Sequence, residues 1–210
     1  KKQRDFDVHS IDRLVDEFDR FERVFYDTAE SEVGETERER AERAYPMVVD
    51  NVSETPPVRI PYTFAAVLGM TDNRDLQVQM ARRSGHLPED APDADIEAAL
   101  ERIEKARAWA ERTDNEFNYR LAEDLPDVDF GADLESALDG LADFIEDESP
   151  DAETLQGEIY ETARDHGVAV GDLFEAGYRL FLNETQGPRL GPFLAPMDTE
   201  FVVERLRRTA

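Results

Sequence analysis

Apolar side chains recur at helical spacing over most of this sequence, and this spacing constrains the fold more than any other feature. One stripe runs from residue 11 to 25, and others cover residues 94–111, 134–145 and 155–166. No convincing alternating stretch longer than four residues is present, and no segment repeats at a fixed interval. The pattern therefore predicts an all-α fold, built as a helical bundle.

Capping residues, prolines and glycines place the shorter elements between these stripes. Ser10 is a candidate N-cap for the first helix, and Ser149-Pro150 offers a cap and a first-turn proline to the helix that ends near His166. Residues 27–40 are charged and weakly patterned, so we expect a mobile connection there. Further helices are predicted at residues 41–52, 62–68, 73–83, 190–194 and 201–208.

The helical pattern disappears between Thr113 and Gly131, in a stretch rich in Asp, Asn and Pro. This loss predicts an N-terminal helical subdomain over residues 1–115, a connecting segment over 116–130 and a C-terminal helical subdomain over 131–210. A chain of 210 residues is long enough to bury two such cores. Because it begins with Lys1 rather than Met, we also expect a fragment or a processed piece.

The charge balance is strongly acidic, with 50 Asp and Glu against 24 Lys and Arg and a net charge of −26. The only lysines are Lys1, Lys2 and Lys105. This composition is typical of proteins from salt-loving organisms; the alternative is an ordinary acidic protein that binds a basic partner. At roughly 1 M salt the Debye length is only about 3 Å, so an acidic surface does not exclude RNA. Counterion release then contributes little, and binding must use stacking, base-edge hydrogen bonds and a few arginines.

Several classes of function lack their sequence signals. Cysteine is absent and no apolar stretch approaches the roughly 20 residues of a membrane span, which favours a cytoplasmic protein without a membrane partner. His9, His86 and His166 lie far apart and match no metal-ligand spacing. No Gly-rich phosphate loop is present, and no pair of carboxylates stands out among so many. We therefore predict no catalytic residues, no metal and no cofactor in this chain.

The densest basic patch lies near the C-terminus. Two Gly-Pro units, at Gly187 and Gly191, are expected to set tight turns and to bring residues 190–194 across the apolar run that ends at Phe181. Arg189 would then project from a rigid turn. A solvated run of charge is the alternative for this patch, which comprises Arg179, Arg189, Arg205, Arg207 and Arg208.

Two weaker groups lie upstream. Trp109 shares a helix flank with Arg102, Lys105 and Arg112, which suits either a stacking platform or an aromatic ring packed at the core edge, with Lys105 paired to Glu101. Arg59 and Tyr62 stand beside Pro61 in a segment that is otherwise core. Arg82-Arg83 ends a helix, where cations either bind phosphate or simply interact with the helix dipole.

The order of elements from Leu155 to Arg208 is an amphipathic helix, an apolar run, two Gly-Pro steps and a basic helix. This order resembles the C-terminal anticodon-binding region of class I lysyl-tRNA synthetases, of a haloarchaeal type, and less closely that of glutamyl-tRNA synthetases. The likeness covers most of the chain, loosely around residues 16–26 and more firmly around Trp109. The strings Gly-Pro-Arg-Leu-Gly-Pro-Phe-Leu at 187–194 and Asp-Thr-Glu-Phe-Val-Val at 198–203 favour the lysine family.

The resemblance implies an α-helix cage that holds the anticodon arm of tRNA(Lys). It also implies a parent enzyme that uses ATP and Mg²⁺ to join lysine to tRNA, through a catalytic domain that this chain lacks. Strings like the HIGH and KMSKS motifs of class I catalytic domains do not occur here. The predicted role is recognition of RNA, and not of DNA, through Arg179, Arg189, Arg205 and Arg208, with Arg59, Tyr62 and Trp109 as weaker candidates.

Two alternatives remain open at this point. The first is the anticodon-binding domain of a glutamyl-tRNA synthetase. The second is a non-enzymatic acidic helical scaffold that binds a basic protein. The scaffold predicts that the arginines scatter over the folded surface and form no concave patch.

Overall fold

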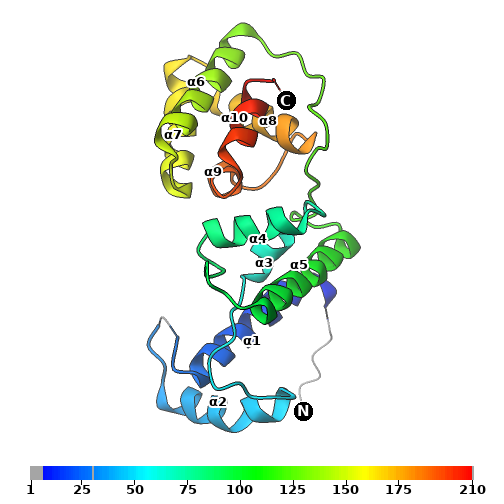
Figure 1. The fold of residues 1–210 in the computed structure, drawn as a ribbon, viewed down its shortest axis with the longest axis vertical. Helices are drawn as coiled ribbons and strands as arrows, with labels where there is room; N and C mark the ends of the chain where they lie inside the picture. The colour runs from blue at the N-terminus through cyan, green and yellow to red at the C-terminus, as the bar shows by residue number, and fades with distance from the viewer. Residues whose placement is uncertain (1–6, 30, 210) are drawn as a thin grey trace.

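A computed structural model describes residues 7–29 and 31–209 of the chain (Figure 1). Within these residues the secondary structure is helical and contains no strand, which confirms the all-α prediction. Helices of the N-terminal half are η1 (Val8–Ser10), α1 (Ile11–Phe25), α2 (Glu35–Val48), α3 (Tyr62–Leu68), α4 (Arg74–Arg83) and α5 (Asp93–Thr113). Those of the C-terminal half are α6 (Ala132–Glu148), α7 (Ala152–Asp165), α8 (Val170–Leu182), α9 (Leu190–Leu194) and α10 (Thr199–Leu206).

The N-terminal half is a three-helix cluster that carries a helical hairpin. Helix α3 packs along α5, with α4 beside both, and the antiparallel pair α1 and α2 extends away from them (Figure 1). The stripe expected on residues 94–111 is the buried face of α5, where Ile103 and Ala106 are almost fully buried. Burial of such apolar surface stabilises the fold by about 25 cal/mol per Å².

The C-terminal half stacks five helices around Phe181, Leu138 and Ile159, which are fully buried. Helix α9 lies against α7, and α10 lies against α6 (Figure 1). Phe193 of α9 meets Phe181 of α8 edge to face, with ring centroids 6.3 Å apart. The short helix therefore crosses the apolar run, as its position in the sequence predicts.

A segment without helix, residues 114–131, runs between the two halves and bonds to both (Figure 1). The Leu121 amide donates to the carbonyl of Met70 at 3.0 Å, and the Ala122 amide donates to that of Phe181 at 2.8 Å. One hydrophobic cluster includes buried side chains of both halves. The division at 1–115, 116–130 and 131–210 stays a prediction, and its first six residues and residue 210 lie outside the described residues.

Local signals at the ends of three helices, α1, α2 and α7, were misread. Helix α2 begins at Glu35, inside the expected connection, and ends at Val48 rather than Val52. Ser10 makes no side-chain cap to α1; its hydroxyl donates to the Asp7 carbonyl instead. Ser149 ends α6 in a left-handed conformation at φ 45°, and Asp151 caps α7 by accepting from the Thr154 amide at 2.8 Å.

The second Gly-Pro step is not a turn, because Gly191 and Pro192 lie inside α9. A methyl group on Gly191 would lie 2.6 Å from Cβ of Gln156 on α7. The Gly191 amide also donates to the buried Gln156 side chain at 3.0 Å. Glycine is needed here for the close approach of α9 to α7, and the adjacent proline occupies the first turn, where it needs no amide.

Candidate nucleic-acid interface

Arg205 lies in the interior and has no surface to offer a nucleotide. Its side chain is 3% exposed, and its guanidinium donates to the carbonyl oxygens of Ala122, Glu123, Asp124 and Leu180 at 2.8–3.2 Å. The Phe201 ring covers it, with the guanidinium carbon 5.1 Å from the ring centroid. We therefore assign Arg205 a structural role and leave it out of the proposed RNA-facing set. Below, this group and its four carbonyls are called the arginine anchor.

The other terminal arginines pair with carboxylates on three different helices. Arg179 pairs with Glu175 on α8 at 2.7 Å, and Arg189 pairs with Glu153 on α7 at 3.4 Å. Arg207 and Arg208 pair with acidic residues of α6: Asp139, Asp143 and Glu146. These residues form no single concave patch, as the scaffold alternative predicts for them. Exposed ion pairs contribute only about 0–1 kcal/mol each to stability. Arg179 and Arg189, whose side chains are partly exposed, can therefore exchange their carboxylate partners for another ligand.

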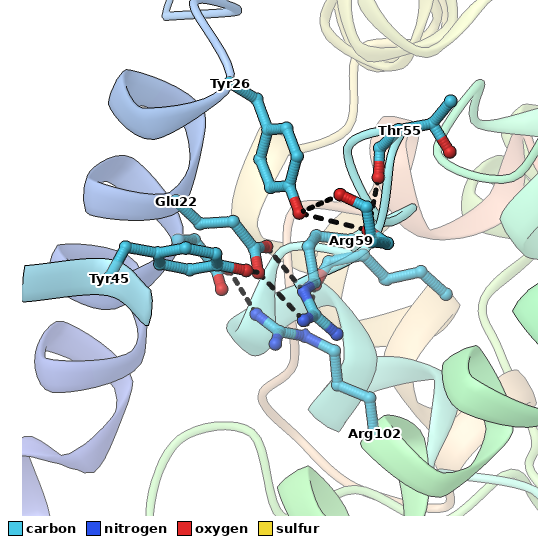
Figure 2. Close-up of polar contacts among 9 residues, drawn as sticks. Glu22, Tyr26, Tyr45, Thr55, Arg59 and Arg102 are labelled. Atoms are coloured by element: carbon cyan, nitrogen blue, oxygen red, sulfur yellow. Dashed lines mark hydrogen bonds and ion pairs between the residues drawn. The ribbon is translucent and has the colours of Figure 1, made fainter. Parts of the chain in front are cut away.

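Arg59 belongs to a buried polar cluster that fastens α1 to the rest of the N-terminal half (Figure 2). Its guanidinium donates to both carboxylate oxygens of Glu22, at 2.8 and 3.0 Å, and the Tyr45 hydroxyl donates to the same carboxylate at 2.5 Å. Arg102 donates to Asp19 and, at 2.6 Å, to the Ile60 carbonyl. We call Asp19, Glu22, Tyr45, Arg59 and Arg102 the polar joint.

Tyr62 and Trp109 pack in the core beside this joint. They are 7% and 5% exposed, and their ring centroids lie 5.6 Å apart. The indole nitrogen of Trp109 donates to the Val8 carbonyl at 2.8 Å. Lys105 pairs with Glu101 at 2.7 Å. The packing alternative for this helix flank is therefore confirmed, and a stacking platform on Trp109 has no exposed ring to use. Arg59 and Tyr62 do share the wall of a depression of about 560 Å³ against α1.

A larger concave surface lies where the two halves face each other. This interhelical cleft has a volume of about 760 Å³. The N-terminal half contributes α3 and the end of α4, and the C-terminal half contributes the α6–α7 junction, α9 and the start of α10. Its polar or aromatic lining from the first half comprises Phe64, Arg83, Ser84 and His86. Its walls in the second half are mostly apolar, among them Ile145, Leu155, Pro192, Leu194 and Met197.

Two partly buried rings stand at one wall of the cleft. Phe64 and His86 are tilted by 56° with centroids 4.9 Å apart. Burial lowers the pKa of His86 from its ordinary value of 6.5, so the imidazole is neutral at pH 7. A neutral ring offers one donor and one acceptor beside an aromatic face. Such a pair suits the stacking and edge recognition of an unpaired base.

Arg83 bridges the two halves at the cleft. Its guanidinium donates to the Met197 carbonyl and lies 3.6 Å from the carboxylate of Asp198, the N-cap of α10. Its side chain remains 35% exposed. Arg83 at the end of α4 therefore makes a tertiary contact in addition to its favourable interaction with the helix dipole. The cleft thus combines a cation, aromatic rings and an apolar wall. These are the groups that bind an unpaired nucleotide without reacting with it.

Residues 7–29 and 31–209 contain no group of three or more His, Cys, Asp or Glu side chains placed to hold a metal ion. Among the same residues no helix is long and apolar enough to cross a membrane.

Local sequence patterns indicate only part of this cleft. They mark Arg83 as a candidate and assign most of the segment around Tyr62 to the core, but they do not connect either to residues more than 60 positions away. After α4 the chain turns at Gly85, whose φ is 74°. This turn places His86 beside Phe64, and the glycine is the local sequence signal for it. The clustered arginines of the C-terminus were a weaker guide, because spacing along a helix does not show which carboxylates lie opposite.

Comparison with known proteins gives a consistent result. The chain is 70% identical over 208 residues to a lysine–tRNA ligase of Natronomonas pharaonis and 56% identical over 209 residues to that of Halobacterium salinarum. Each alignment covers 99% of this chain. A lysine–tRNA ligase of Thermococcus kodakarensis is 30% identical over 92% of the chain. The chain spans about 38% of the length of these relatives. No protein-family model matches it.

Proposed function

We propose, for a chain that belongs to the archaeal class I lysine–tRNA ligase family, that it recognises the anticodon of tRNA(Lys) for its parent enzyme. The observation that carries this proposal is the 70% identity to a lysine–tRNA ligase over 99% of the chain. All the relatives named above are lysine–tRNA ligases, which does not favour the glutamyl-tRNA synthetase or scaffold alternatives. The two most similar of them are haloarchaeal, in agreement with the halophilic interpretation of the charge.

The proposed mechanism is recognition by shape and stacking. Unpaired anticodon bases enter the interhelical cleft, where Phe64 and His86 supply ring faces and Arg83 supplies a charged donor. Arg189 is the N-cap of α9, and Pro192 and Leu194 of this helix line the cleft. Arg179 and Arg208 stay weaker candidates for backbone contacts. In molar salt, screening removes most of the repulsion between the phosphates and the −26 chain.

The chemistry belongs to the rest of the parent enzyme. In this proposal that enzyme works in the cytoplasm and uses ATP and Mg²⁺ to activate lysine and transfer it to tRNA(Lys). Binding of the anticodon arm here positions the acceptor end in the catalytic domain. The residues that line the cleft would then act through affinity and orientation. Truncating their side chains would reduce the attachment of lysine to tRNA only by weakening the complex with tRNA.

The test is anisotropy of labelled tRNA(Lys) titrated with this chain in molar potassium chloride. A transcript with a replaced anticodon should bind about tenfold or more weakly, since lost base-edge contacts cost about 1.4 kcal/mol per decade. Equal affinity for the two transcripts would reject base recognition.

A pair of variants locates the contact. Arg83→Gln should lower affinity for the natural transcript severalfold, because it removes the charge that lines the cleft. Arg74→Gln is the matched control, because Arg74 begins the same helix and pairs with Glu97 away from the cleft. If both variants bind tRNA equally well, the cleft is not the contact.

A further inference from the structure

A row of aromatic rings crosses the outer face of α7 and α8. Tyr160 is 45% exposed, and its ring meets that of Phe174 edge to face at a centroid distance of 5.6 Å. Phe174 is 6.3 Å from Tyr178, one helical turn further on. Large apolar side chains are rarely exposed in the described part of this chain, and Tyr160 is one of five. We call Tyr160, Phe174 and Tyr178 the aromatic row.

The end of the row nearest the Gly-Pro turn is held rigidly. The Tyr178 hydroxyl donates to the Pro188 carbonyl at 2.9 Å. A methyl group on Gly187 would lie 2.5 Å from ring carbon Cδ1 of Tyr178, so glycine lets the turn press against the ring. Burial raises the pKa of Tyr178, with smaller contributions from Tyr119 and Tyr160, and the hydroxyl therefore stays protonated as a donor. A fixed ring loses little conformational entropy when a ligand stacks on it.

The row ends near the interhelical cleft. The Pro188 carbonyl that holds Tyr178 directly precedes Arg189, and Arg189 pairs with Glu153. Glu153 follows Ala152, which lines the cleft. The turn at residues 187–189 therefore joins the end of the row to α9, and Pro192 and Leu194 of α9 line the cleft. Arg189 and Arg179 flank the row with side chains that are 62% and 42% exposed.

We propose that the aromatic row stacks unpaired nucleotides that flank the anticodon, extending the RNA contact from the cleft across α7 and α8. The inference rests on the proposed function for its ligand. Partly exposed rings, separated along two helices and flanked by arginines, match successive bases and their phosphates. Stacking depends little on salt, so the row suits a strongly acidic chain that must bind RNA without much electrostatic attraction.

The experiment uses a labelled short oligoadenylate and labelled tRNA(Lys), both titrated with the 210-residue chain in molar potassium chloride. Tyr160→Ser should weaken oligoadenylate binding by at least about fivefold, the lower limit for one stacked base. Tyr160→Phe should retain the affinity and Tyr160→Trp should retain or increase it, because both keep a ring. Met47→Ser is the matched control, since Met47 is 82% exposed on α2, away from the row.

The outcomes separate the two proposals. Unchanged oligoadenylate affinity in Tyr160→Ser, or no binding by the unsubstituted chain, overturns the aromatic row whatever the tRNA titration shows. Binding that depends on Tyr160, together with equal affinity for natural and replaced anticodons, supports the row and overturns the anticodon proposal alone. A loss in Tyr160→Ser that Tyr160→Phe also shows would point to the hydroxyl rather than the ring and would overturn stacking.

Discussion

The polar joint and the arginine anchor both bury arginine side chains, yet they neutralise the charge in opposite ways. In the joint, Arg59 and Arg102 face the carboxylates of Glu22 and Asp19, which are 2% and 4% exposed. In the anchor, Arg205 faces only backbone carbonyls, one of them Leu180 in the last turn of α8. The partial negative charge at a helix C-terminus favours a cation there.

This difference separates what the two devices do. A joint made of ion pairs fixes a unique arrangement of α1 against α3 and α5, and its net contribution to stability is small because both partners are desolvated. An anchor made of carbonyls satisfies backbone groups of a segment without helix, and it ties residues 122–124 to α8 and α10. The anchor holds residues 122–124 of the segment between the two halves that form the cleft. The joint lies within the N-terminal half, and its hydrogen bonds do not involve this segment.

The largest expected effect is therefore on Arg205. Arg205→Met should lower the free energy of unfolding by about 3–5 kcal/mol, because four carbonyl oxygens lose a buried, charged donor. Arg205→Lys should recover only part of this, since an ammonium cannot reproduce the planar fork. Denaturant unfolding at constant molar salt measures both. A loss below about 1 kcal/mol would show that the anchor is dispensable.

The joint should respond less to loss of one partner. Glu22→Gln removes the counter-charge of Arg59 but keeps a side-chain acceptor, and Arg59 is 32% exposed and can reach water. We expect a loss of about 2–3 kcal/mol in the same unfolding assay. Glu37→Gln is the matched control, because Glu37 pairs with Arg20 at the exposed surface and should change stability by less than about 1 kcal/mol. Equal losses at Glu22 and Arg205 would remove the distinction between the two regions.

Sequence patterns predicted the helices well and these two regions poorly. The stripes of α1 and α5–α7 are set by local periodicity, and Asn73, at the expected start of α4, caps that helix. The start of α2 was missed because few apolar residues mark its first turns. Arg205 looked like a surface cation because it stands in a basic run, although Arg205 and Leu206 are the buried members of it.

The candidate site shows the same limit. A cleft assembled from residues 64, 83, 86 and 145–202 depends on how two helical halves dock, and no local pattern carries that information. The burial of Trp109 was among the alternatives, since a tryptophan next to an apolar stripe serves either packing or stacking. The structure shows packing, because the Trp109 indole donates to the carbonyl of Val8, which lies 101 residues away in the sequence.

Binding of RNA offers a third way to compare the two regions. Arg205→Lys should weaken tRNA(Lys) binding by about tenfold, roughly 1.4 kcal/mol, because the segment that spaces the two halves of the cleft is no longer held. Glu22→Gln should change the same affinity less than about twofold. Anisotropy at a temperature where both variants are folded measures this. A larger effect at Glu22 would place the RNA contact on the α1–α2 side instead.

The smallest expected effect concerns pH. Burial raises the pKa of Asp19 from its ordinary value of 3.8, and the opposing influence of Arg102 and Arg59 does not cancel it, while Glu22 adds to the rise. The folded state thus holds this proton more tightly than the unfolded chain, so the contribution of Asp19 to stability falls as pH rises from 3.8 through the folded pKa. Relative to Asp19→Asn, the unsubstituted chain should gain stability on acidification through that window. Parallel pH profiles would show that Asp19 is not perturbed. No carboxylate bonds to Arg205 in the anchor, and its variants should show no such difference.

The central claim is that anticodon bases enter the cleft between the two halves of a strongly acidic chain. Cross-linking tests it most directly, with tRNA(Lys) that carries 4-thiouridine in the anticodon, irradiated with this chain in molar potassium chloride and followed by mass spectrometry of the labelled peptides. The account predicts cross-links to peptides that contain Phe64, residues 83–86 or the wall at 192–199. Cross-links confined to α1 and α2, with none at the cleft, would contradict it.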